Sequence, residues 1–150
     1  MIENMMYNPV DVLIVEDNPN DAELTMRALK KQNLANNVFL VRDGEEALDF
    51  LFGKGKYKER VGILPARVVF LDLKLPKISG LDVLREIKSN PDTRRIPVVV
   101  VSSSKEDPDI QKAYELGANS YVVKPVNFDD FINAISKTGF FWLLVNELPK

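Results

Sequence analysis

The chain has 150 residues, of which 45% are hydrophobic and 28% charged, and these values are typical of one folded domain. It contains neither cysteine nor histidine, which excludes disulfides, thiolate chemistry, zinc sites built on imidazole and a Ser-His-Asp triad. The net charge of -2 argues against nucleic acid as the main partner, and neither a membrane-spanning apolar run nor a secretory signal is present, so we expect a cytoplasmic protein.

Five short apolar segments predict strands, and they alternate with five segments of helical spacing. The expected strands are 10–15, 37–41, 67–71, 97–101 and 120–123, and the expected helices are 20–32, 43–53, 79–91, 107–119 and 127–135. The first, third and fourth strands are nearly continuous in Val, Ile, Leu and Phe, which is typical of strands covered on both faces. The alternation predicts an α/β fold with a parallel sheet, helices on both faces and right-handed crossovers.

One long polar connection, GKGKYKERVGIL, separates the second helix from the third strand. Its lysines could suggest phosphate binding. It lacks the glycine and lysine spacing of a phosphate-binding loop, so we expect a plain solvated loop.

Polar side chains follow four of the five predicted strands. In an open parallel sheet the carboxyl ends of the strands form one edge, and ligands bind there. We therefore expect three carboxylates, a hydroxyl and an ammonium group to converge. They belong to Glu16 and Asp17 after the first strand, Asp72 after the third, Ser102 to Ser104 after the fourth and Lys124 after the fifth.

Asp72 directly follows the apolar run VVFL, where an unpartnered buried carboxylate would be strongly unfavourable. Clustered carboxylates also repel one another unless positive charge is present. All-oxygen ligation without histidine or cysteine favours Mg²⁺, with Glu16 and Asp17 at the metal end and Asp72 shared. Taken singly, the Glu16 and Asp17 pair and the serines Ser102 to Ser104 are also compatible with helix caps, and Lys124 with a surface lysine.

Three segments carry a resemblance to a known family. They read IVEDNPNDAELTMRAL, VFLDLKLPKISGLDVLREIK and PVVVVSSSKEDPDIQKAYELGANSYVVKPV. Together they resemble the receiver domain of two-component response regulators, over about residues 10–135. The resemblance implies a flavodoxin-like, doubly wound five-stranded parallel sheet of order 2-1-3-4-5. It also implies a single receiver domain over 1–150, with a helical extension over 136–150 and no output domain.

The resemblance also implies a role for each residue of the strand-end cluster. It makes Asp72 the phosphoacceptor, and it implies that Lys124 is followed by a cis peptide at Pro125. The other implied roles are Mg²⁺ ligation by Glu16, Asp17, Asp72 and the backbone carbonyl of Lys74, phosphoryl contact by Lys124, and switching by Ser102 and Tyr121.

By this resemblance the protein accepts a phosphoryl group from a sensor histidine kinase and signals by protein–protein contact. It is then a signalling protein rather than an enzyme, with Mg²⁺ as its cofactor. The long loop after the second helix and the ending FFWLLVNELP look most similar to stand-alone regulators associated with phytochrome-type kinases.

Three departures from the family pattern and three alternatives accompany this interpretation. The metal pair is Glu-Asp, Ser102 stands where threonine is commoner, and Lys74 lies two residues after the acceptor. The alternatives are a receiver-like binding module that is never phosphorylated, a flavodoxin-like redox protein and an aspartyl-phosphate hydrolase. The acidic EDNPND after the first strand disfavours the redox protein, and Lys74, where a hydrolase would carry a second aspartate, disfavours the last.

The C-terminal segment FFWLLV, residues 140–145, is apolar over more than one face of a helix. We expect the last helix to continue past Ser136 and to present Phe140, Phe141 and Leu144 to a second copy of the chain or to the kinase, so a homodimer is predicted. The alternative is a tail that folds back over the edge of the last strand.

Overall fold

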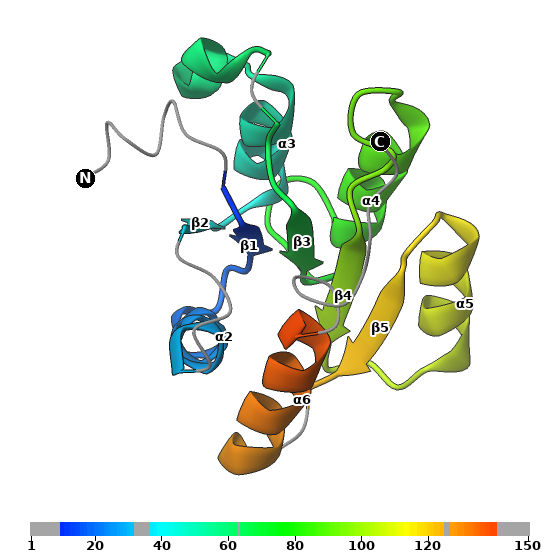
Figure 1. Ribbon diagram of the computed structural model, residues 1–150. Helices are drawn as coiled ribbons and strands as arrows, with labels where there is room; N and C mark the ends of the chain where they lie inside the picture. The colour runs from blue at the N-terminus through cyan, green and yellow to red at the C-terminus, as the bar shows by residue number, and fades with distance from the viewer. Residues whose placement is uncertain (1–9, 32–36, 63, 125–126, 141–150) are drawn as a thin grey trace.

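The computed structural model describes residues 10–31, 37–62, 64–124 and 127–140, and Figure 1 shows the arrangement of their helices and strands. The elements alternate as the sequence predicts, and most boundaries agree within about two residues. The strands are β1 (Val12–Val15), β2 (Val38–Val41), β3 (Val68–Leu71), β4 (Val98–Ser102) and β5 (Ser120–Val123). The helices are α2 (Pro19–Lys31), α3 (Gly44–Phe52), the 3₁₀ helix η1 (Gly55–Arg60), α4 (Gly80–Ser89), α5 (Asp107–Glu115) and α6 (Phe128–Phe140).

The five strands form one parallel sheet in the order β2-β1-β3-β4-β5, which confirms the predicted flavodoxin-like topology. In β1, Val15 pairs with Val41 of β2 and with Leu71 of β3. All strands point the same way, so their carboxyl ends lie at one edge of the sheet and their amino ends at the other.

Helices cover both faces of the sheet (Figure 1). Residues alternate along each strand, so that Leu13 and Val15 join one buried cluster while Val12 and Ile14 join the other. The first cluster packs under α3, α4 and α5, and the second packs under α2 and α6. Because β1, β3 and β4 are buried along their whole length, the prediction of strands covered on both faces is confirmed.

The prediction of a solvated loop after the second helix is wrong. Residues Gly55–Arg60 form η1, in which Tyr57 and Arg60 are buried although the lysines around them are exposed. The Tyr57 ring packs edge-on against the Phe50 ring, with 5.1 Å between centroids. The Arg60 guanidinium lies over the Phe50 ring, 4.4 Å from its centroid. The side chains of Tyr57 and Arg60 therefore pack against Phe50 and fill the end of the core beside α3.

The last helix continues past Ser136, as predicted, and α6 is described through Phe140. Phe141, Leu144 and the rest of residues 141–150 lie outside the described residues, and so does Pro125 with its predicted cis peptide. No helix in the described ranges combines the length and the apolarity needed to cross a membrane.

Candidate functional site

The carboxyl edge of the sheet brings together charged side chains from three strand ends and one helix. The Nζ atom of Lys124, after β5, donates to Glu16 Oε1 at 2.7 Å and to Asp72 Oδ2 at 3.3 Å. It also donates to Asp21 Oδ2, from the first turn of α2, at 2.8 Å. The Lys124 side chain is only 11% exposed, so one ammonium group is held among three carboxylates with little competing water.

Asn18 caps helix α2, which leaves the neighbouring carboxylates free for other contacts. Its Oδ1 atom accepts hydrogen bonds from the backbone N–H groups of Asn20 and Asp21 at 2.9 and 3.1 Å. Glu16 instead accepts at Oε2 from the Asn18 N–H at 3.2 Å. The helix-cap alternative for the Glu16 and Asp17 pair therefore loses its main support, because the neighbouring asparagine performs that role.

A close approach of the backbone fixes the loop that carries Asp72. The Gly80 N–H, at the start of α4, donates to the Leu73 carbonyl at 2.9 Å. A Cβ atom at Gly80 would lie 2.2 Å from the Asp72 carbonyl oxygen, so a residue with a side chain cannot be accommodated there without displacing the loop. Helix α4 thus packs directly against the backbone of Asp72 and Leu73, and this packing fixes the position of the loop that carries the carboxylate.

The electrostatics of this cluster show a shortage of positive charge. Burial, together with hydrogen bonding and repulsion from Asp72, raises the pKa of the Glu16 carboxyl to about 8, in spite of the nearby Lys124. Burial disfavours the charged form of Lys124, but the hydrogen bonds with Asp21 and Glu16 outweigh it and raise the pKa of the ammonium above its ordinary value. A lysine that is always protonated is therefore insufficient to keep the whole cluster ionised near neutral pH.

The donor set fits a hard divalent cation. One carboxylate oxygen from each of Glu16, Asp17 and Asp72 lies within 4.8 Å of the others. Glu16 and Asp72 are buried and Asp17 is exposed, so the three oxygens form a cluster that is open to solvent on one side. The Lys74 N–H approaches Asp72 Oδ1 at 3.4 Å, which places the peptide of this residue beside the cluster. Oxygen-only ligands with solvent access suit Mg²⁺ or Mn²⁺.

Ser102 and Tyr121 are both bonded to Ser104 rather than to the carboxylates. The buried Ser102 hydroxyl accepts from the Ser104 N–H at 3.1 Å, and the Tyr121 hydroxyl donates to the Ser104 carbonyl at 3.0 Å. The Ser104 hydroxyl donates to Asp109 of α5 at 2.5 Å. Within the described residues no hydrogen bond joins the Ser102 hydroxyl to Glu16, Asp17 or Asp72, so Ser102 lies at the edge of the cluster and faces the β4–α5 loop.

The sequence did not predict that Asp21 belongs to the site, and it did not predict the role of Ser104. Asp21 contacts Lys124 across 103 positions, and its only sequence signal is that it lies four residues after Asp17 on a helix. Ser104 was predicted only as one of three serines that follow the fourth strand and could also cap a helix, yet its backbone joins Ser102 to Tyr121. Both residues act through the relative placement of β4, β5 and α2, which local patterns do not encode.

Comparison with known proteins agrees with this geometry. Residues 12–136 match the response regulator receiver domain family. The chain is 38% identical to response regulator Rcp1 of Synechocystis sp. over 141 residues, which cover 94% of each protein. The crystal structure of the Mn²⁺-bound form of Rcp1 has a TM-score of 0.85 and covers 95% of this chain and 100% of that one, at 38% identity. The crystal structure of the phosphorylated cyanobacterial phytochrome response regulator RcpA has a TM-score of 0.86 and covers 96% and 99%, at 37% identity.

The match extends over nearly all described elements, from β1 into α6. The relatives include regulators associated with phytochromes, and one of them has been seen with a divalent metal. With its order 2-1-3-4-5 sheet and its acidic cluster at the carboxyl edge, this chain belongs to the response regulator receiver domain family.

Proposed function

We propose that this protein accepts a phosphoryl group on Asp72 from a sensor histidine kinase of the phytochrome type, and that it then signals by protein–protein contact. The observation that carries the proposal is the placement of Asp72. Its carboxylate lies at the end of β3, with the Lys124 ammonium at 3.3 Å and carboxylates of Glu16 and Asp17 beside it. Proteins of this family are in general signalling proteins rather than enzymes.

In the proposed reaction an oxygen of Asp72 attacks the phosphorus of a phosphohistidine on the kinase. The new O–P bond forms as the N–P bond breaks, and the electron pair of that bond stays on the imidazole nitrogen, which takes up a proton. Lys124 stays charged throughout, because its pKa is raised, and it contacts a phosphoryl oxygen as a point charge. To make that contact, the Lys124 ammonium must give up its hydrogen bond to Glu16 or to Asp21, which is unfavourable.

Mg²⁺ is the proposed cofactor, held by Glu16, Asp17, Asp72 and the backbone carbonyl of Lys74. When bound, it neutralises charge on the phosphoryl oxygens and favours attack by a carboxylate. Support comes from the oxygen-only donor set and from the Mn²⁺-bound form of Rcp1.

Ser102 is the proposed sensor of the phosphoryl group. To donate to a phosphoryl oxygen, its hydroxyl must turn away from the Ser104 N–H that it now accepts from. The same residue, Ser104, holds the hydroxyl of Tyr121 and bonds to Asp109. A rearrangement at Ser102 therefore perturbs the β4–α5 loop and the face of α5 and β5 that a partner would read.

The test is phosphorylation of Asp72→Asn. The substitution is nearly isosteric and removes the nucleophile, so incubation with acetyl phosphate and Mg²⁺ should add a phosphoryl mass to the wild type and none to the variant, as measured by intact mass spectrometry. Asp49→Asn, on α3, is the matched control and should be phosphorylated normally. Equal incorporation in Asp72→Asn would reject the assignment, and no incorporation in the wild type would favour the receiver-like binding module.

We also propose that residues 1–150 form a single receiver domain, that the protein acts in the cytoplasm and that it forms a homodimer through its C-terminal helical region. The continuation of α6 through Phe140 supports the last point, because the apolar segment then starts on a formed helix. Sedimentation at micromolar concentration should show a dimer that is lost on truncation after Thr138, whereas a monomer in both forms would contradict it.

A further inference from the structure

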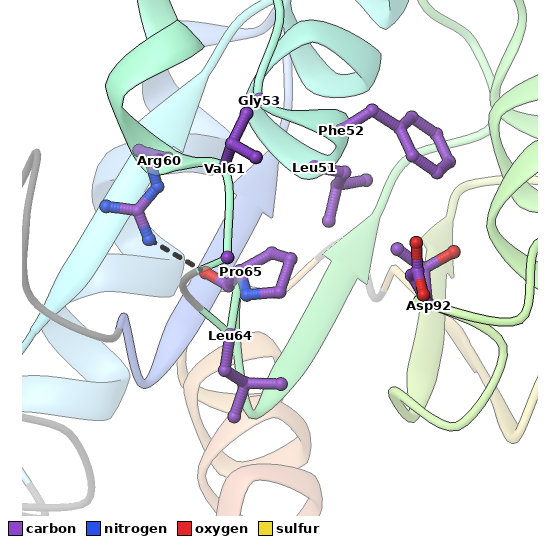
Figure 2. A pocket seen from close by; sticks show the side chains of 10 residues that line it. Leu51, Phe52, Gly53, Arg60, Val61, Leu64, Pro65 and Asp92 are labelled. Atoms are coloured by element: carbon purple, nitrogen blue, oxygen red, sulfur yellow. Dashed lines mark hydrogen bonds between the residues drawn. The ribbon is translucent and has the colours of Figure 1, made fainter.

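A groove lies at the amino edge of the sheet, opposite the carboxylate cluster. It consists of two adjoining cavities of about 360 Å³ each, which share Leu64 and Asp92. Figure 2 shows the first cavity, between the end of α3 and the segment that leads from η1 to β3. The second cavity extends from there over Ala66 and Ile96 to Arg94 and Arg95. We call the two cavities together the amino-edge groove.

The walls of the amino-edge groove are held by hydrogen bonds. The buried Thr93 hydroxyl donates to the Ile87 carbonyl at 2.7 Å. The Nζ atom of Lys88 donates to the carbonyls of Arg94 and Ile96 at 3.1 and 2.8 Å. The turn before β4 is thus fixed at its backbone, and only the side chains of its arginines extend outward. A surface that is already ordered loses little conformational entropy when a partner binds.

The groove combines an apolar floor with a cationic rim. Ala66 and Ile96 are buried beneath it, and Leu64 at its border is 49% exposed. Arg94 and Arg95 are exposed, and within the described residues neither guanidinium forms an ion pair.

The charge of this region is opposite to that of the molecule as a whole. The lining of the groove contains the guanidinium groups of Arg60, Arg94 and Arg95 but one carboxylate, that of Asp92, whereas the full chain has a net charge of -2. Such a local excess of guanidinium groups beside exposed apolar surface favours an occupant that carries both carboxylates and an apolar side chain.

We propose that the amino-edge groove docks an acidic peptide segment of a partner protein. An aliphatic or aromatic side chain of that segment packs against Leu64 over the buried Ala66 and Ile96, and its carboxylates pair with Arg94 and Arg95. Guanidinium groups suit this role because they bind carboxylates through two parallel hydrogen bonds.

Docking at this edge leaves the site of the proposed phosphorylation accessible. Ala66 and Ile96 lie just before β3 and β4, whereas Asp72 and Ser102 lie at their carboxyl ends. The strands are parallel, so the two sites are separated by the length of the sheet. The groove can therefore hold a partner in either phosphorylation state, and its function does not depend on the role proposed for Asp72.

The test begins with selection of peptides from a displayed random library on the immobilised full-length protein. The expected peptides have a net negative charge and at least one aliphatic or aromatic residue. A synthetic copy of the most enriched peptide is then titrated into ¹⁵N-labelled protein, and the largest shifts should fall on backbone amides of Leu64, Ala66 and Arg94 to Ile96.

Charge reversal separates this groove from general electrostatic attraction. Arg94→Glu/Arg95→Glu should weaken the peptide at least about tenfold in fluorescence anisotropy. Lys30→Glu/Lys112→Glu, which changes the net charge equally at exposed positions on α2 and α5, should change the affinity less than about twofold. Asp72→Asn should leave the affinity unchanged.

Several results would overturn the proposal. They are a library without enriched acidic peptides, equal weakening by the two double variants, and shifts confined to the carboxyl edge. Binding to vesicles of phosphatidylserine or to single-stranded DNA, without any peptide binding, would assign the arginines to a lipid surface or a nucleic acid and would reject a peptide partner. Both double variants change exposed side chains, and thermal melting verifies that they fold.

Discussion

Two lysines at opposite edges of the sheet have opposite surroundings. At the carboxyl edge, Lys124 donates to three carboxylates, those of Glu16, Asp21 and Asp72. At the amino edge, the acceptors of Lys88 among the described residues are neutral oxygens, namely the carbonyls of Arg94 and Ile96 and the side-chain oxygen of Asn119 at 3.0 Å. The pKa of Lys124 is raised above its ordinary value by its anionic partners, whereas burial lowers the pKa of Lys88 to about 8.

The difference separates a site organised for chemistry from one organised for structure. Lys88 satisfies backbone carbonyls where the chain enters β4, so it serves the same purpose as a helix or turn cap. Lys124 partly neutralises carboxylates that would otherwise repel one another. A metal ion can relieve the remaining repulsion, and the proposed phosphoryl transfer depends on this balance of charge.

Lys124→Met should lower the free energy of unfolding by about 3 kcal/mol at neutral pH, because it leaves carboxylates buried without a cation. Chemical denaturation measures the change. Lys112→Met, on the exposed face of α5, is the control and should change stability by less than about 0.5 kcal/mol. Similar stability of the two variants would mean that protonation of Glu16 replaces the ammonium at little cost.

Lys88→Met should lower the free energy of unfolding by about 1–3 kcal/mol, because carbonyls at the amino edge lose their donor. The effect is smaller than at Lys124, since the groups left behind are neutral. The same denaturation series and the same Lys112→Met control apply. A loss larger than that of Lys124→Met would reverse the contrast between the two edges.

The lowered pKa of Lys88 should also make the free energy of unfolding depend on pH. Burial lowers its pKa to about 8 in the folded protein, whereas an unfolded lysine titrates near about 10.4. Between these values the unfolded chain binds more protons, so the contribution of Lys88 to stability rises with pH and is lost as pH falls through about 8. The stability difference between wild type and Lys88→Met should therefore grow from about pH 7 to about pH 10. A constant difference would show that the carbonyl acceptors offset the burial.

Mg²⁺ should raise the melting temperature, because it binds the folded cluster and not the unfolded chain. At ten times its Kd the expected stabilisation is about 1.4 kcal/mol. Replacing Glu16 and Asp17 together by Ala should remove this response, while Asp43→Ala/Glu45→Ala, at the start of α3, should retain it. A response that persists in the first double variant would locate the metal elsewhere.

Lys74→Asn should change the lifetime of phosphorylated Asp72 several-fold, equivalent to about 1 kcal/mol in the hydrolysis barrier. The side chain is exposed and lies two residues after the acceptor, where it can shield the phosphorus from water or attract a phosphoryl oxygen. Dephosphorylation followed by mass spectrometry after removal of acetyl phosphate measures it. Equal rates would show that Lys74 remains in solvent.

Much of the fold follows from local sequence patterns. Continuous apolar runs such as VVFL and VVVV could be assigned to buried strands. The helix stops at Gly53 and Gly117 could be predicted from the glycines themselves, and both residues have positive φ angles, of 62° and 107°. The strand-end positions of Asp72 and Lys124 also follow, because the carboxyl ends of parallel strands must share an edge. The order of the strands came from family resemblance and not from these patterns.

Long-range contacts, in contrast, depend on the tertiary structure. The contact between Asp21 and Lys124 requires that α2 and the end of β5 lie beside the same cluster, a relation between residues 103 positions apart. The burial of Tyr57 and Arg60 inside a lysine-rich segment depends on the ring of Phe50, which only packing provides. Periodicity and side-chain chemistry are local, so the sequence is enough to show which groups each strand places at the edge. The sheet order decided which of those groups meet, because an ion pair forms only where the packed elements hold its two charges together.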